Sequence, residues 1–273
     1  MSGEALMGAL DRLYSFMVIR GFKVWISYKT QVVLNFVSWS IPIFLYYFIG
    51  LTFGIARMSA LVDYNYTAFA AIGIAFQGYF SAAVTTLAGR IRNEQLMGTL
   101  EYQLAAPLSP MSLMMYSTVW GFVINAISTV TVLLISMGLG VAYHVNVLAT
   151  SVALLLYMAS IIGLNLIAGA VILIVKQGNP IALFTSIASN ILGNVVFPIS
   201  ILPQWLKDIS YALSITWALS ALRDSMLMGY GLARIIPLLW PLAILSAAYL
   251  AIGIATVNYA FRKVLVEGTV HMY

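Results

Sequence analysis

The sequence predicts an all-α integral membrane protein with six transmembrane helices, folded as a single domain over residues 1–273. Hydrophobic residues make up 62% of the chain and charged residues only 8%, whereas a soluble domain carries about 25% charged residues. So few charges cannot coat a water-exposed surface. The apolar runs are continuous and do not alternate with polar residues, which favours helices over a membrane β-barrel.

Stretches without charged side chains set the number of predicted spans. Each is long enough for the ~20 residues that a helix needs to cross the hydrocarbon core. His144 interrupts one long stretch, so a turn at Tyr143–Asn146 is predicted to separate two spans there. The stretches are 30–56, 64–89, two within 102–175, 177–206 and 235–261.

Three segments outside these spans are predicted to be helical. In residues 4–28 apolar side chains recur at helical spacing with charges on other faces, which predicts an amphipathic helix in the membrane interface, either orienting the first span or acting as a simple anchor. Leu96, Leu100 and Leu104 recur every fourth residue, which predicts a short amphipathic helix over 90–106, ended by Pro107.

The third segment, residues 203–229, is too polar for a span and too apolar for a solvated loop. It predicts a re-entrant helix pair, over 204–213 and 217–228, that dips into the membrane without crossing it. Ser214 or Thr216 is the expected N-cap of the second helix, and Gly229 is expected to end it.

Lysine and arginine residues predict the orientation of the chain. Nine of them lie on the side that holds both termini and the 90–110 segment, and four lie on the other side. Positive residues collect on the cytoplasmic side, so we expect a multi-pass protein of the cell membrane with both termini cytoplasmic. The net charge of +5 then reflects topology and affinity for the lipid bilayer, with no nucleic-acid partner expected.

The sequence offers little for catalysis. It contains two histidines and no cysteine, which disfavours a transition-metal site, and no carboxylate or lysine lies within a predicted span. It also lacks the G-x-x-x-x-G-K-[ST] phosphate-binding loop. We therefore expect no catalytic residue, no metal site and no cofactor bound by this chain, so any ATP must act through a partner.

Uncharged polar residues inside the predicted spans are candidates for a polar lining of a substrate route. The alternative is that they form hydrogen bonds between helices, worth about 0.6 kcal/mol each. The candidates are Gln77, Asn125, Asn165, Asn190 and Asn194.

Two motifs resemble those of the type-2 ATP-binding-cassette exporter permeases. The first has the form E-x-x-x-G-T-L-E-x-L…P-L-S and consists here of Glu94, Gly98, Thr99, Leu100, Glu101, Leu104, Pro107, Leu108 and Ser109. The second precedes the last span and consists of Pro198, Leu202, Pro203, Trp205 and Leu206, followed by Ala221, Leu222 and Arg223. Where the family often has Asn-Pro, this chain has Leu213-Ser214, which affects only the local turn.

The resemblance implies a transporter built from several subunits. The 90–106 helix would be a coupling helix that docks on a separate ATPase, with Glu94 and Glu101 as charged contacts beside Gly98, Thr99 and Leu100. Two ATPase copies, carrying ATP and Mg²⁺, would drive this chain together with a second permease copy or a paralogue. The re-entrant pair would form an outer gate, with Pro203, Trp205, Trp217 and Arg223 near it.

The implied function is export of an amphipathic drug-like or lipid substrate out of the cytoplasm or inner leaflet by alternating access. Export of a lipid-linked or polymeric saccharide is the alternative within the family. A channel or a non-transporting scaffold subunit is the alternative of another class, and the lack of intramembrane charge disfavours a proton-coupled carrier.

Overall fold

The computed structural model describes residues 22–52, 65–97, 110–175, 187 and 189–267, and all regular structure within these ranges is helical. The long helices are α3 (Lys29–Thr52), α5 (Tyr66–Met97), α7 (Pro110–Gly138), α8 (Val147–Val175) and α12 (Leu232–Glu267). The short elements are α2 (Val24–Ser27), the 3-10 turn η2 (Ile199–Ile201), α10 (Gln204–Tyr211) and α11 (Ser214–Met226).

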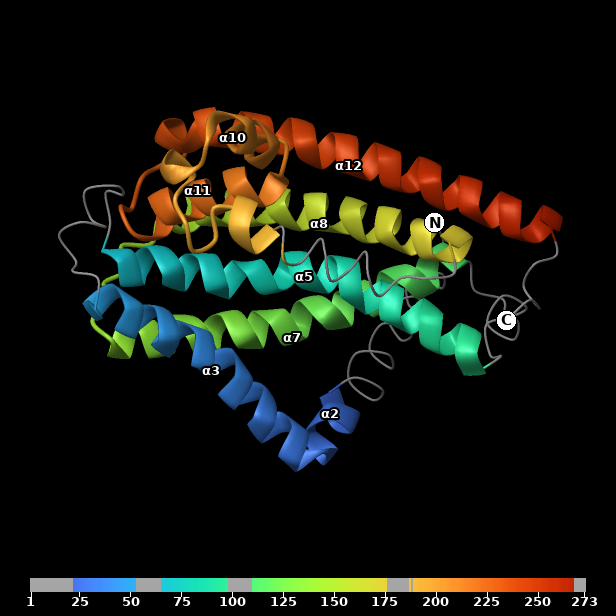
Figure 1. The fold of residues 1–273 in the computed structure, drawn as a ribbon, viewed down its shortest axis with the longest axis horizontal. Coiled ribbons are helices and arrows are strands. Elements are labelled where there is room, and N and C mark those ends of the chain that lie inside the picture. Colours follow the sequence, from blue (N-terminus) through green and yellow to red (C-terminus); the bar gives the residue numbers. More distant parts are fainter. Residues whose placement is uncertain (1–21, 53–64, 98–109, 176–186, 188, 268–273) are drawn as a thin grey trace, which may run out of the picture.

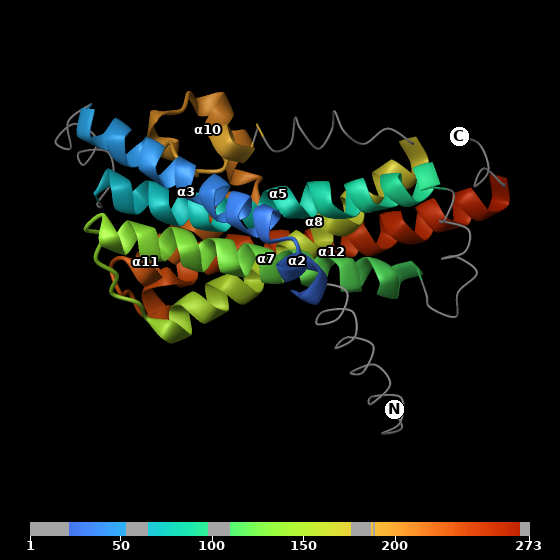
Figure 2. The ribbon, with the colours of Figure 1, turned by 90° about the horizontal axis from the view of Figure 1, so that it is seen from below.

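Helices α5, α7, α8 and α12 run side by side along the long axis of the molecule (Figures 1 and 2). One end of this bundle, the α11 end, holds α10, α11, the start of α5 and the turn between α7 and α8. The opposite end, the Met97 end, holds the ends of α5, α8 and α12 and the start of α7. Helix α3 packs on α5 and α7 near Thr52 and diverges from them toward Lys29 (Figure 1).

Four of the predicted spans are confirmed as helices long and apolar enough to cross a membrane. They are Lys29–Thr52 of α3, Val119–Gly138 of α7, Val147–Val171 of α8 and Leu232–Ala260 of α12. The predicted turn at Tyr143–Asn146 separates α7 from α8, as expected.

Two other predicted helices lie only partly within the described residues. Of the 4–28 segment, residues 4–21 lie outside them, and Val24–Ser27 form α2. Of the 90–106 segment, residues 98–106 lie outside them. Residues 90–97 do not begin a helix of their own, because α5 continues without a break from Tyr66 to Met97.

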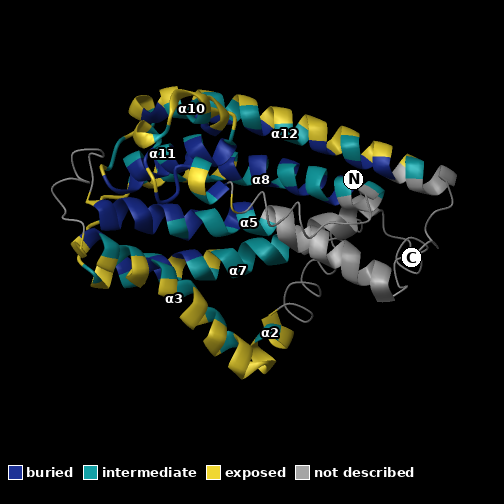
Figure 3. Ribbon diagram, viewed as in Figure 1, coloured by how far each residue is buried: buried dark blue, intermediate teal, exposed yellow. Residues whose placement is uncertain are grey.

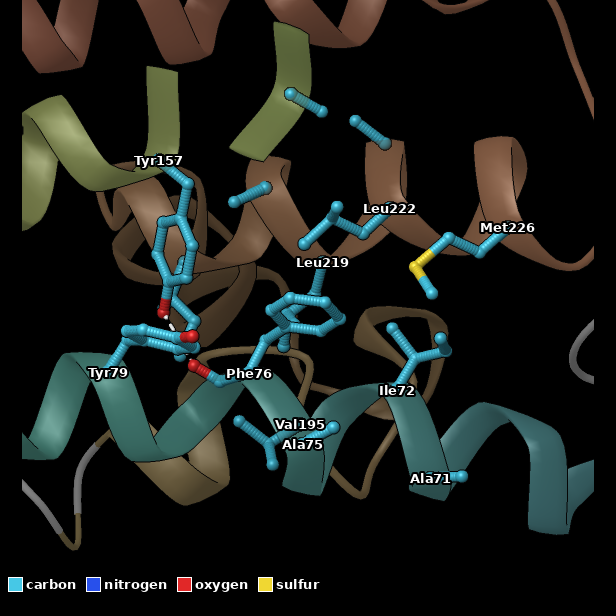
Figure 4. Packing of buried hydrophobic residues seen from close by; sticks show 14 of the residues in the cluster. Ala71, Ile72, Ala75, Phe76, Tyr79, Tyr157, Val195, Leu219, Leu222 and Met226 are labelled. Carbon is cyan, nitrogen blue, oxygen red and sulfur yellow. Dashed lines mark hydrogen bonds between the residues drawn. The ribbon is translucent and has the colours of Figure 1, made fainter. Parts of the chain in front are cut away.

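The core lies at the α11 end, where α5, α8 and α11 meet (Figure 3). Ala149, Ala153, Tyr157 and Ile161 of α8 are fully buried and recur every fourth residue, so one stripe of the helix faces the core. Its alanines let neighbouring backbones approach closely, as is usual between membrane helices. Figure 4 shows Leu219, Leu222 and Met226 on the side of α11 that faces Ile72 and Phe76 of α5.

Glycines let α8 and α12 come together without side chains between them. A Cβ atom added at Gly163 would lie 2.5 Å from the backbone nitrogen of Leu250 and 2.6 Å from the carbonyl oxygen of Tyr249. A Cβ atom added at Gly253 would lie 2.6 Å from the carbonyl oxygen of Gly163. Because those neighbours are backbone atoms, a larger residue would force the two helices apart.

We therefore predict that Gly163→Ala destabilises the protein, whereas Gly138→Ala does not. Overpacking a tight contact costs about 1–3 kcal/mol, and a Cβ atom at Gly138 would meet nothing within 4 Å. The measurement is the apparent melting temperature of the detergent-solubilised chain. Equal melting temperatures for the two variants would contradict the close α8–α12 contact.

Candidate functional site

The most unusual part of the described chain is a non-helical stretch, residues 193–197, at the α11 end of the bundle. It follows a helix that ends at Leu192 and precedes Pro198, which cannot donate a backbone hydrogen bond. Asn194 has a φ of 57°, a left-handed conformation that residues other than glycine seldom adopt. Residues 193–196 are nevertheless buried, so their polar backbone groups need partners within the protein.

Side chains of α10 and α11 supply partners on one side of this segment. The carbonyl oxygen of Leu192 accepts hydrogen bonds from the hydroxyls of Ser210 and Thr216, the latter at 3.4 Å. The side-chain nitrogen Nδ2 of Asn194 donates to the hydroxyl of Ser220 at 3.1 Å. The end of the helix and the left-handed residue are thus held by hydroxyl groups from two short helices.

Arg223 of α11 reaches across this segment to α5. Its Nε and Nη2 atoms donate to the carbonyl oxygen of Phe69, at 3.2 and 2.9 Å, and Nη2 also donates to the carbonyl oxygen of Val195 at 2.9 Å. The guanidinium carbon lies 3.5 Å from the centre of the Phe69 ring, a cation–π contact. Nearby, the Tyr66 hydroxyl donates to the carbonyl oxygen of Val196 at 3.3 Å.

The burial of Arg223 requires these contacts. Only 1% of its surface is exposed, and a charged side chain at mid-bilayer costs about 2.5–3.5 kcal/mol on insertion scales when nothing compensates it. The fork of the guanidinium offsets this cost by binding two carbonyl groups at once. Gly73 makes room for the arrangement, since a Cβ atom there would lie 2.9 Å from Nη2 and would overlap the Val195 carbonyl.

The turn between α7 and α8 closes the other end of α11. The backbone nitrogens of His144 and Asn146 donate to the carbonyl oxygens of Met226 and Ser225, at 2.8 and 2.9 Å. A helix leaves its last carbonyl groups without intrahelical donors, so this turn supplies what α11 lacks. Gly229, which was expected to end α11, has a φ of 66° and lies beside His144, but the helix already ends at Met226, three residues earlier.

The predicted start of α11 needs one correction. We expected Ser214 or Thr216 to cap the helix, but the N-cap position is Leu213, without a side-chain hydrogen bond. The Ser214 hydroxyl instead accepts a hydrogen bond from Ser160 of α8 at 3.0 Å, and Thr216 contacts Leu192. Both hydroxyls bind residues of other helices and therefore do not cap α11.

The four residues predicted for the outer gate lie in different surroundings. Pro203 precedes α10 on the surface, and the Trp205 side chain is 65% exposed. Trp217 is half-buried and donates to the carbonyl oxygen of Tyr211 at 2.8 Å, which closes the turn between α10 and α11. Arg223 is hydrogen-bonded to α5.

The candidate lining residues lie on several elements. Gln77 of α5 donates to Ser81 at 2.7 Å, and Asn125 of α7 donates to the carbonyl oxygen of Gly121 at 2.8 Å, each within its own helix. Both are half-buried, and Asn125 lies against Gly78 of α5. Asn165 is buried on α8, Asn190 is half-buried, and Asn194 belongs to the 193–197 segment.

The predicted coupling residues lie at the Met97 end or outside the described residues. Glu94 is on the last turn of α5. Gly98, Thr99, Leu100 and Glu101 lie outside the described residues. Among the described residues, no three His, Cys, Asp or Glu side chains are grouped closely enough to hold a metal ion.

Sequence reasoning missed the partners that Arg223 binds. Tyr66, Phe69 and Gly73 look like ordinary parts of an apolar span, and the bound groups of Phe69 and Val195 are backbone carbonyls, which every residue has. The available signal was the position of Arg223 in the A-L-R motif, within a segment, Trp217–Met228, whose other charged residue is Asp224.

One family model, described as ABC-2 type transporter, matches residues 14–227. The match includes the 193–197 segment, Arg223 and both motifs. No curated protein matches the chain.

We predict that Arg223→Met destabilises the protein, because it leaves the buried Val195 carbonyl without its donor. Such a loss costs about 1–3 kcal/mol. Arg234→Met is a matched control, since Arg234 also stacks on an aromatic ring, that of Tyr230 at 3.6 Å, but is exposed. Apparent melting temperatures check this, and a control variant as unstable as Arg223→Met would contradict the assignment.

Proposed function

The chain belongs to the ABC-2 type transporter family, and from this membership we propose that it is the membrane-spanning permease subunit of an ATP-driven exporter. The observation that carries the proposal is the family match over residues 14–227. The sequence has no phosphate-binding loop, so we assign ATP and Mg²⁺ to a separate ATPase subunit. The functional unit is then two ATPases with this chain and a second permease, identical or paralogous.

We propose that energy enters at the Met97 end of the bundle. The segment between Met97 and Pro110 joins α5 to α7, and these two helices pack against each other. A displacement of the segment by a docked ATPase would therefore move both helices. Glu94 and Glu101 are the proposed charged contacts, and Gly98, Thr99 and Leu100 lie between them in sequence.

The proposed topology has six spans in the cell membrane. Helix α5, with no charged residue from Tyr66 to Gly89, and the charge-free stretch 177–206 are the two further proposed spans, beside the four helices that are long and apolar enough to cross a membrane. The excess of positive charge puts the Met97 end and both termini in the cytoplasm. The α11 end then faces outward, and α10 and α11 form the re-entrant outer segment.

For the substrate we propose an amphipathic drug-like or lipid molecule. At the contact between α5 and α7, the amide of Asn125 lies against Gly78, and the ring centres of Tyr79 and Phe122 are 6.0 Å apart, so both amide and aromatic groups line this contact. Such a mixture can bind a molecule with an apolar body and a polar group.

We predict that replacing both Glu94 and Glu101 by alanine abolishes co-purification of the ATPase and compound-stimulated ATP hydrolysis. Each charge-assisted hydrogen bond is worth about 1.5–3 kcal/mol, so each loss weakens docking by about tenfold or more. Asp208→Ala is the control, because Asp208 is an exposed carboxylate at the α11 end. Unchanged co-purification of the double variant would refute the docking assignment.

A second prediction concerns the two ends of the bundle. The chain has no cysteine of its own, so single cysteines report accessibility without background. In intact cells, a membrane-impermeant maleimide should label Gln204→Cys, on exposed α10, and should label Arg262→Cys, near the end of α12, only after lysis. The reverse pattern would invert the topology.

A further inference from the structure

We infer that Arg223 is a positioning residue that couples residues 193–201, at the α11 end, to α5. Movement at the Met97 end then reaches these residues. The inference rests on the proposed function, since it assumes that an ATPase moves the Met97 end. It adds a route by which that movement reaches the opposite end of the chain.

The first step is the form of α5. It is one helix of 32 residues, which spans about 48 Å at 1.5 Å per residue. It contains no proline between Tyr66 and Met97, the commonest cause of a sharp kink. A helix of this kind transmits a shift or tilt at one end to the other, and α5 runs from the coupling motif to the α11 end (Figure 1).

The second step is what α5 holds at the α11 end. A single nitrogen, Nη2 of Arg223, donates to the Phe69 carbonyl of α5 and to the Val195 carbonyl of the 193–197 segment, both at 2.9 Å. These two bonds set the separation between the helix and the segment. The Tyr66 hydroxyl makes a parallel bond to the Val196 carbonyl, and the segment packs directly on Gly73.

The third step is that the segment is not held as firmly by its own chain. It has no helical hydrogen bonds over residues 195–197, and Asn194 adopts a left-handed conformation. Its position therefore depends on side chains from other elements. Arg223 and Tyr66 connect the segment to α5. A movement of α5 therefore displaces the segment, and with it the η2 turn that comes next in the chain.

A lysine cannot replace Arg223 in this role. Lysine keeps the positive charge but lacks the planar fork that binds two carbonyl groups in fixed directions. Arg223→Lys therefore separates the coupling role from the presence of a charge. Tyr66→Phe is a milder variant, since it removes only the hydroxyl that binds the Val196 carbonyl and keeps the buried ring.

The experiment follows the accessibility of residue 200, in the η2 turn, through the ATPase cycle. Ser200→Cys places a reporter on the exposed η2 turn of the cysteine-free chain. In the complex with its ATPase, the rate of alkylation by a membrane-impermeant maleimide is measured without nucleotide and with ATP plus vanadate. The readout is the nucleotide-dependent difference in rate, which a uniformly loosened structure would not produce.

We expect a clear difference in the otherwise wild-type chain, loss of that difference with Arg223→Lys, and a reduced difference with Tyr66→Phe. Arg234→Lys, the same exchange at an exposed site, should retain the full difference. ATPase co-purification and basal hydrolysis should survive in all variants, because none of these residues lies at the Met97 end. If Arg223→Lys yields no folded complex, the nucleotide-dependent difference in alkylation rate of Tyr66→Phe tests the coupling instead.

Retention of the full difference by the folded Arg223 and Tyr66 variants overturns the inference. So does the absence of any nucleotide effect at position 200 in a complex that assembles and hydrolyses ATP. A wild-type chain that neither binds an ATPase nor supports hydrolysis overturns the proposed function instead, which keeps the two failures distinct.

Discussion

The fork of hydrogen bonds from Arg223 to the carbonyl groups of Phe69 and Val195 is the contact on which the α11 end of this protein depends. A membrane protein must satisfy its backbone polar groups internally, and the 193–197 segment has left the helix that would do so. The guanidinium serves this segment and α5 together. Its own burial is tolerable because the same bonds compensate its charge.

This constraint explains why so many small polar side chains gather around one end of an apolar bundle. Ser210 and Thr216 bind the last carbonyl of the preceding helix, Ser220 holds Asn194, and the turn at His144 closes α11. The contacts of Ser210, Thr216 and the turn give backbone groups a hydrogen-bond partner that lipid cannot provide, and Ser220 fixes the Asn194 side chain. The irregular backbone of residues 193–196 is thus held inside the protein by side chains from α5, α10 and α11, and it lies at the opposite end of α5 from Glu94.

Sequence predictions agreed with the structure where they depended on charge exclusion or on local turn residues, and they failed where distant residues make contact. Charge-free runs predicted α3, α7, α8 and α12, because hydrocarbon excludes charge whatever the tertiary contacts are. Prolines and glycines likewise marked α10 and α11 to within a few residues. The expected cap at Ser214 was wrong because its hydroxyl contacts Ser160 instead, and a local rule cannot anticipate a residue 54 positions away.

The sequence by itself determined that this chain is helical and belongs in a membrane, and it carried the motifs of the family to which the chain belongs. These properties depend on composition and on short spacings. Only the tertiary structure decided what Arg223 does, because its partners are backbone carbonyls of Phe69 and Val195, 154 and 28 residues away. A carbonyl leaves no trace in the sequence, so folding alone shows which ones an arginine binds.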